Sequence, residues 1–211
     1  MGKSARLANR PQARAAKAEA MRRAERRRQW LPVWIGGGVV VVGAVIVLLL
    51  LGSFGKGAGQ LPASTKTFAE NNHQHVTGTV RYDRTPPAGG AHSATWLNCG
   101  VYDQRVPNAN AVHSLEHGSI WITYRPTLSL NAINQLQQFV ESHYDGTQRY
   151  LVLSPYPGLP APVVASAWGA QLRLTGPGDP GLAAFVAHYI GGNQGGEQGA
   201  PCTGGTGSPI G

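Results

Sequence analysis

The sequence is poor in charge, since Asp, Glu, Lys and Arg together make up only 13% of its 211 residues. Hydrophobic residues make up 42% of the chain, which excludes a largely disordered protein. The charged fraction is lower than in a typical soluble protein. The chain also lacks an internal repeat and the G-x-S-x-G motif of serine hydrolases. These absences argue against a repeat architecture and against a serine nucleophile.

Basic residues are concentrated at the N-terminus, and this explains the formal net charge of +8. Residues 1–29 contain ten Lys and Arg against two Glu, so this basic tail carries the whole excess, and residues 30–211 are formally neutral. A nucleic-acid-binding domain needs its own basic face. The composition therefore argues against nucleic acid as a partner of residues 30–211, and anionic lipid headgroups are the expected partner of the tail, with a cytoplasmic protein or nucleic acid as the alternative.

No charged residue occurs between positions 31 and 54, and the core of this segment is almost entirely Val, Ile, Leu, Gly and Ala. About 20 apolar residues suffice for a helix to cross a membrane, so residues 31–53 are a predicted transmembrane helix. Trp30 and Trp34 stand at one end, where indole rings favour the headgroup layer. Arg26, Arg27 and Arg28 precede them, which predicts a cytoplasmic N-terminus and an extracytoplasmic C-terminal part. Small residues in 52–60 leave a cleaved signal peptide as the alternative.

The outer part divides into a linker (54–64), a domain (65–190) and a Gly-rich tail (191–211). Within the domain, β-branched and apolar patterns predict strands, and a helical period or an Asp-Pro start predicts helices. The expected strands are 75–81, 119–124, 149–154 and 163–174 (the last a long strand or a hairpin arm), and the expected helices are 128–143 and 180–190. This order predicts an α+β fold, with two helices on one face of a small, mainly antiparallel sheet, preceded by the transmembrane helix.

The chain has only two cysteines, Cys99 and Cys202. Outside the cytoplasm a disulfide between them is the expected state, and it would attach the Gly-rich tail to the domain. The alternative is a thiolate metal ligand or a redox role for Cys99.

The histidines are clustered: five of the seven fall within 45 residues. His73 and His75 have the i, i+2 spacing that places both rings on one face of a strand. His113 and His117 have the i, i+4 spacing of one helical turn, with Glu116 beside them. Imidazole and carboxylate groups bind transition metals, so we expect a Cu or Zn site. Its candidate ligands are His73, His75, His92, His113, Glu116 and His117.

Two other interpretations of these histidines remain open. They could be solvated or could only brace loops by hydrogen bonds, in a non-catalytic structural or interaction domain. His113 to His117 also matches H-x-x-E-H, the signature of a class of zinc peptidases, for which Glu141 or Glu197 would have to supply a distant third ligand. His143 and His188 lie at the ends of the two expected helices, where a structural role is expected. Whether the protein is an enzyme stays undecided.

Several motifs together resemble a known family. They are Tyr82, Pro86-Pro87, Gly90, His92, Trp96, Gly100, Tyr102, the HSLEHG segment at 113–118, Tyr124, Ala167-Trp168-Gly169 and Gly199-Ala200-Pro201-Cys202. The chain is similar over about residues 65–204 to an uncharacterised bacterial membrane-protein family, "domain of unknown function 3105". The family often has Ser-Gly-Pro-His where this chain has Gly-Gly-Ala-His at 89–92. The resemblance implies an extracytoplasmic domain anchored in the bacterial cell membrane, and it implies no activity.

Overall fold

The structure is a computed structural model that describes residues 19, 21–23, 25–26, 60–143 and 150–210. The chain separates into two units, residues 1–56 and 57–211, and every strand and helix discussed below belongs to the second. The predicted transmembrane segment 31–53 lies outside the described residues. Among the residues that are described, no helix has the length and apolar character needed to cross a membrane.

The second unit is built on one six-stranded sheet with the strand order β1-β6-β5-β3-β4-β2. The strands are β1 (Lys66–Thr67), β2 (Gly100–Val101), β3 (Ile120–Tyr124), β4 (Leu151–Pro155), β5 (Val163–Ala167) and β6 (Ala170–Leu174). The helices are α2 (Asn108–Glu116), α3 (Leu130–Ser142) and α4 (Pro180–Tyr189). The predicted α+β class is therefore confirmed.

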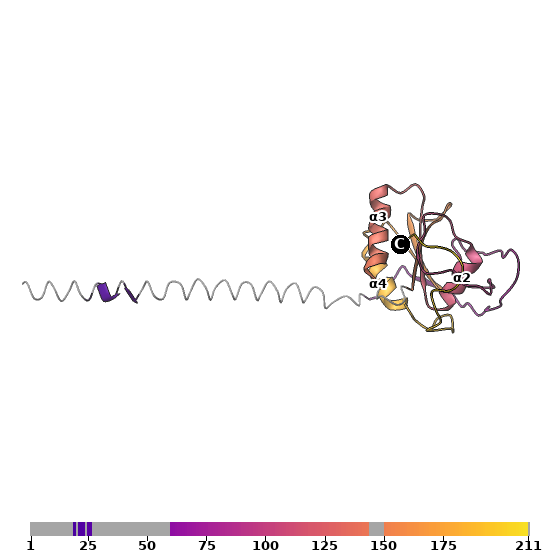
Figure 1. Ribbon diagram of the computed structural model, residues 1–211, viewed down its shortest axis with the longest axis horizontal. Helices are drawn as coiled ribbons and strands as arrows, with labels where there is room; N and C mark the ends of the chain where they lie inside the picture. Colours follow the sequence, from indigo (N-terminus) through magenta and orange to yellow (C-terminus); the bar gives the residue numbers. More distant parts are fainter. Residues whose placement is uncertain (1–18, 20, 24, 27–59, 144–149, 211) are drawn as a thin grey trace, which may run out of the picture. The chain divides into compact units, whose positions relative to one another are not determined.

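Helices cover both faces of the sheet. Leu136 and Val140 of α3 pack with Leu182 and Phe185 of α4 against one face, and these two helices lie together in Figure 1. Leu115 of α2 belongs to a second core on the other face. Both β3 and β4 are buried along their whole length, as expected for strands covered on two sides. The prediction of two helices on one face is correct for α3 and α4, and it missed α2 on the opposite face.

The sheet is mixed, which corrects the prediction that it is mainly antiparallel. β1, β6, β5 and β3 pair antiparallel in turn, whereas β3 pairs with β4, and β4 with β2, in parallel. The reason is that α3 lies between β3 and β4 in the chain, and a helical crossover is the connection that parallel neighbours require.

Two expected strands turned out differently. Residues 163–174 form the β5–β6 hairpin, with Gly169 in its turn at a φ of +67°. Residues 75–81 form no strand, and only His75 makes an isolated bridge, in parallel with His92. This bridge still matters, because it fixes the His73–His75 segment next to His92.

The segment 191–210 folds back onto the domain without forming a helix or a named strand. The disulfide between Cys99 and Cys202 is present, and the backbone N–H of Cys99 also donates to the carbonyl of Cys202 at 2.8 Å. Further along, Asn98 N–H donates to Thr206 O at 2.8 Å, and Ile210 N–H donates to Val101 O at 2.8 Å. This segment is therefore positioned to contribute residues to the face that carries α2.

Candidate metal centre

The C-terminal half of α2 carries the centre of the site. His113, Glu116 and the C-capping His117 lie one turn apart, and each is no more than 3% exposed. The helix ends at this point, because Gly118 has a φ of +92°, outside the helical region, and only glycine fits there, since a Cβ would lie 2.6 Å from Gly192 O. The three side chains are consequently held in a buried position by the end of the helix.

The Glu116 carboxylate lies among three imidazoles. His73 Nδ1 lies 2.5 Å from Oε1, His92 Nε2 lies 2.8 Å from Oε2, and His75 Nε2 lies 3.6 Å from Oε2. The backbone places them: Val76 N–H donates to His92 O at 2.7 Å, and His92 N–H donates to Gln74 O at 3.0 Å. The i, i+2 spacing then turns both His73 and His75 toward Glu116.

Three of the imidazoles are oriented by backbone carbonyls. His92 Nδ1 donates to Gly90 O at 2.7 Å, His113 Nδ1 to Ser93 O at 2.6 Å, and His117 Nδ1 to Pro201 O at 2.9 Å. A carbonyl oxygen only accepts, so each Nδ1 carries the hydrogen and each Nε2 is left for another partner. Metal-binding histidines are typically held in this way, with the distal nitrogen bonded to a carbonyl or carboxylate.

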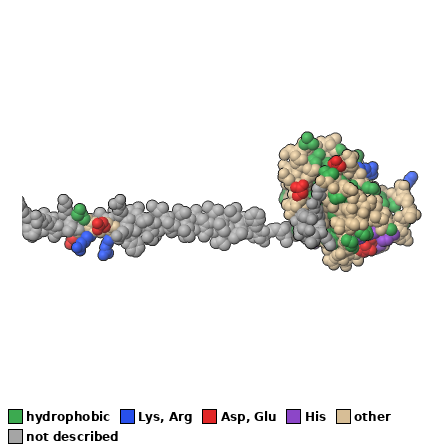
Figure 2. All heavy atoms as spheres, in the orientation of Figure 1, with side chains coloured by type: hydrophobic (Ala, Val, Ile, Leu, Met, Phe, Trp, Pro, Cys, Tyr) green, Lys and Arg blue, Asp and Glu red, His purple; other side chains and the backbone are tan. Residues whose placement is uncertain are grey.

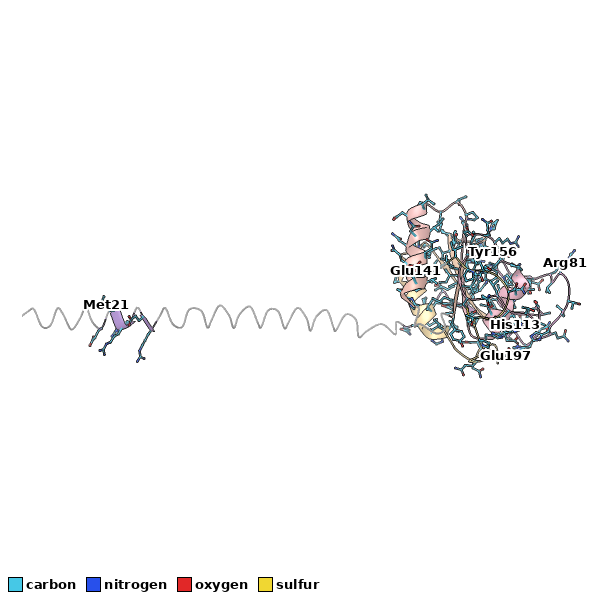
Figure 3. The ribbon with its side chains drawn as sticks, viewed as in Figure 1. Met21, Arg81, His113, Glu141, Tyr156 and Glu197 are labelled. Atoms are coloured by element: carbon cyan, nitrogen blue, oxygen red, sulfur yellow. A yellow bond between two sulfur atoms is a disulfide. The ribbon has the colours of Figure 1, made fainter. Side chains whose placement is uncertain are left out.

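A second carboxylate, Glu197, comes from the tail segment. Its Oε2 lies 3.2 Å from His117 Nε2 and 3.8 Å from His113 Nε2, and its side chain is 44% exposed. Figure 3 shows His113 and Glu197 on the same side of the domain, and acidic and histidine side chains adjoin on the surface in Figure 2. Gly195 packs so closely on the backbone of Glu116 that a Cβ at position 195 would overlap it, and this contact holds this part of the tail.

All six residues predicted as metal ligands are thus brought together; five of them form two overlapping groups with Glu197, whereas His73 contacts Glu116 and belongs to neither group. The first group is His75, His92, His113 and Glu116, and the second is His113, His117 and Glu197. Within each group the candidate donor atoms all lie within 4.8 Å of one another. The donor set is imidazole nitrogen and carboxylate oxygen, which suits a transition-metal ion. Either group could therefore hold a metal ion.

Sequence reasoning considered Glu197 only as a peptidase ligand and did not include it in the metal site. The signal that could have found it is Cys202, five positions later, because a disulfide to Cys99 returns this stretch of tail to the domain. Two tryptophans were also missed as neighbours of the site. The ring of Trp168 stacks on His73 at 4.6 Å between centroids, and Trp96 lies 5.2 Å from His117.

Burial and neighbouring groups shift the pKa values of Glu116 and His113. Burial alone would raise the pKa of Glu116, but the hydrogen bond from His73 and the charges of His92 and His73 hold that pKa below its usual value. Burial lowers the pKa of His113, and the neighbouring His117, His92 and His75 lower it further, against the opposing hydrogen bond to Ser93. Glu116 therefore stays a carboxylate and His113 stays a neutral imidazole.

Other candidates from the sequence lie apart from this cluster. Both cysteines are in the disulfide, so the alternative of a thiolate ligand at Cys99 is wrong. His143 donates from Nδ1 to Phe139 O at 2.7 Å at the end of α3, and His188 packs on Tyr189 within α4. Glu141 lies on α3, which packs on the opposite face of the sheet from α2 (Figure 3).

Comparison with known proteins gives one finding. A family model described as "Protein of unknown function (DUF3105)" matches residues 73–204. The matched range begins at His73 and contains every residue of both ligand groups and both cysteines. No curated protein and no solved structure matches the chain.

Proposed function

We propose that this chain, which belongs to the DUF3105 family of proteins of unknown function, binds a divalent transition-metal ion at its His–Glu cluster. The observation that carries the proposal is the orientation of His92, His113 and His117. Each donates its Nδ1 hydrogen to a backbone carbonyl and turns Nε2 toward a carboxylate. Fixing one tautomer in advance lowers the cost of ordering a ligand when an ion binds.

The donor chemistry favours Zn²⁺ or Cu²⁺. Three imidazoles and one carboxylate, as in the group around Glu116, make a four-coordinate set of nitrogen and oxygen. Cu⁺ prefers soft sulfur ligands, and the two cysteines are already bonded to each other. Ligands about 2.0–2.1 Å from a tetrahedral ion lie about 3.4 Å apart. Donor atoms now within 4.8 Å of one another therefore need to move inward by about an ångström.

Elemental analysis tests the proposal directly. The full-length chain, purified without a histidine tag, should contain one zinc or copper ion per molecule after exposure to the metal and removal of excess. His113→Ala should lose the ion, because His113 belongs to both groups. His188→Ala is the matched control, because His188 is exposed on α4 and lies outside both groups. A wild-type chain that retains no metal would refute the proposal.

A purely structural role is the rival, and one observation favours it. His92 contacts an acceptor with each ring nitrogen, Gly90 O at 2.7 Å and Glu116 at 2.8 Å, so a doubly protonated His92 satisfies the buried carboxylate without a metal. On this hypothesis the wild type binds no metal, and replacing both His113 and His117 by Ala unfolds the domain. Each buried group left without its partner would cost about 1–3 kcal/mol.

A metal-dependent hydrolase is supported by the second group. His113, His117 and Glu197 form the two-His, one-Glu set that catalytic zinc sites use with an open fourth position. Glu116, the expected base of the H-x-x-E-H motif, is occupied by His73 and His92, and its pKa is lowered. A general base works best with a pKa near the working pH, so this arrangement favours binding over hydrolysis. A zinc-dependent hydrolytic activity lost in Glu116→Gln would reverse that preference.

We also propose that the domain stands outside the cytoplasm, tethered to the bacterial cell membrane by residues 31–53. Support comes from the uncharged apolar segment preceded by Arg26, Arg27 and Arg28. The Cys99–Cys202 disulfide adds to it, because such bonds persist in oxidising compartments. A reporter enzyme that works only outside the cytoplasm should be active when it is fused after Gly211. Activity of a cytoplasm-dependent reporter at the same position would contradict this topology.

A further inference from the structure

We propose that the cluster offers a single metal ion two alternative positions, and that the ion is loaded and released through the one that contains Glu197. The proposal rests on the metal-binding function proposed above. The Glu116 position consists of His75, His92, His113 and Glu116, and the Glu197 position consists of His113, His117 and Glu197. The two positions differ in every ligand except His113.

His113 can supply only one donor atom, and this makes the two positions exclusive. Its Nδ1 donates to Ser93 O at 2.6 Å, so Nε2 holds the only lone pair of the neutral ring that is directed into the cluster. One lone pair binds one ion at a time. Two ions bridged by this ring would need both nitrogens, with the Nδ1 proton removed and the bond to Ser93 broken.

The two carboxylates differ in their access to solvent. The Glu116 side chain is 3% exposed and is already engaged by His73 and His92, whereas the Glu197 side chain is 44% exposed. A hydrated ion can therefore reach Glu197 without displacing any hydrogen bond of Glu116. The Glu116 position has one more nitrogen donor, so we expect it to bind the ion more tightly once the ion has arrived.

Movement between the positions is a ligand substitution with no change in oxidation state. The bonds from the ion to His117 and Glu197 break as bonds to His75, His92 and Glu116 form, while the bond to His113 Nε2 is kept. A hydrogen on His92 Nε2, which now faces Glu116, leaves to solvent when the ion takes its place. His113 therefore acts as the pivot of the exchange.

Cobalt(II) is a suitable probe, because its visible spectrum depends on its ligands. The untagged full-length chain should bind one Co²⁺. The Glu197→Gln variant should reach the wild-type spectrum. It should bind Co²⁺, and release Co²⁺ to EDTA, about tenfold more slowly, as expected when the transition state for metal transfer loses one charge-assisted contact. His75→Ala should still bind one Co²⁺, with lower affinity and a changed spectrum, because the ion then stays at the Glu197 position.

Glu141→Gln is the matched control, since Glu141 is an exposed carboxylate on α3 and belongs to neither position. It should leave the spectrum and both rates unchanged. Two Co²⁺ ions per wild-type chain would refute the proposal that the two positions share one ion through His113. Wild-type rates of loading and release in Glu197→Gln would refute the proposal that the ion passes through the Glu197 position. A wild-type chain that binds neither Co²⁺ nor Zn²⁺ would instead refute the proposed function itself, so the two failures are distinguishable.

Discussion

Removing the Cys99–Cys202 disulfide should lower the stability of the domain substantially. The two cysteines are 103 positions apart, so the bond closes a loop of about 100 residues. Chain-entropy theory gives about 4.7 kcal/mol for such a loop, because the open chain gains that much freedom when it unfolds. Measured losses for native disulfides are commonly about 2–5 kcal/mol. We therefore expect the free energy of unfolding to fall by about 3–5 kcal/mol in the Cys99→Ala, Cys202→Ala double variant.

Urea denaturation followed by circular dichroism measures this loss. With a slope of about 2 kcal/mol per M, the midpoint should drop by about 1.5–2.5 M. Reductant should bring the wild type to the same midpoint and should leave the double variant unchanged. A midpoint shift below about 0.3 M would refute the reasoning, because it would mean that the loop does not constrain the unfolded chain.

The same variant has a second expected effect, at the metal centre. Pro201 O accepts the hydrogen of His117 Nδ1, and Glu197 lies five positions before Cys202. Freeing the tail should therefore weaken the Glu197 position while leaving the Glu116 position in place. Slower metal loading with a retained stoichiometry of one ion is the expected result, and faster loading would contradict it.

Four further predictions concern individual side chains and the pH. Glu116→Gln should reduce the stabilisation by zinc without abolishing it, because the ion can still bind at the Glu197 position; for a tight site that stabilisation reaches about 4 kcal/mol at 1,000 times the dissociation constant, as seen by denaturation with zinc and with EDTA. Zinc affinity, measured by chelator competition, should fall as the pH drops below about 6.5, because imidazole binds only when neutral. In the metal-free protein the lowered pKa of His113 means that the unfolded state takes up its proton first, so stability should also fall as the pH drops through 6.5. Asp179→Ala should cost about 1 kcal/mol at pH 7, because Asp179 caps α4 by accepting from Gly181 N–H at 3.0 Å. The pKa of Asp179 is lowered, chiefly by its hydrogen bond from Thr175, so the contribution of its charge should decline in denaturation measurements as the pH falls below 3.8 and should be lost below the lowered pKa.

The elements that the sequence predicted well are those with local signals. The helix α4 begins after Asp179 with Pro180 at its first position, and α3 shows an amphipathic period with Ser129 as its cap. The strand β3 is rich in β-branched and aromatic residues. For the site, the i, i+2 and i, i+4 spacings pointed to His73, His75, His113 and His117, which the structure brings close to Glu116 and Glu197.

What the sequence did not show depends on the packing of distant segments. The helix α2 buries Leu115 in the core and is packed at Glu116 by Gly195 of the tail, so it lacks the polar stripe of a surface helix. Its N-cap, Pro107, makes no side-chain capping bond, so the usual start signal was missing too. Glu197 has no local signal within its Gly-rich surroundings, because contacts with distant segments, among them the disulfide and the close packing of Gly195, bring it to the histidines.

The stacking of Trp168 on His73 gives the cluster its own fluorescent reporter. The indole ring lies 4.6 Å from the His73 ring and 5.6 Å from the His92 ring, and Trp96 lies 5.9 Å from His113. An open-shell ion such as Cu²⁺ quenches an indole this close by electron transfer, whereas Zn²⁺ has a filled d shell and no redox chemistry. Copper held by these imidazoles would therefore darken the intrinsic emission of the protein, and zinc held by the same imidazoles would leave that emission bright.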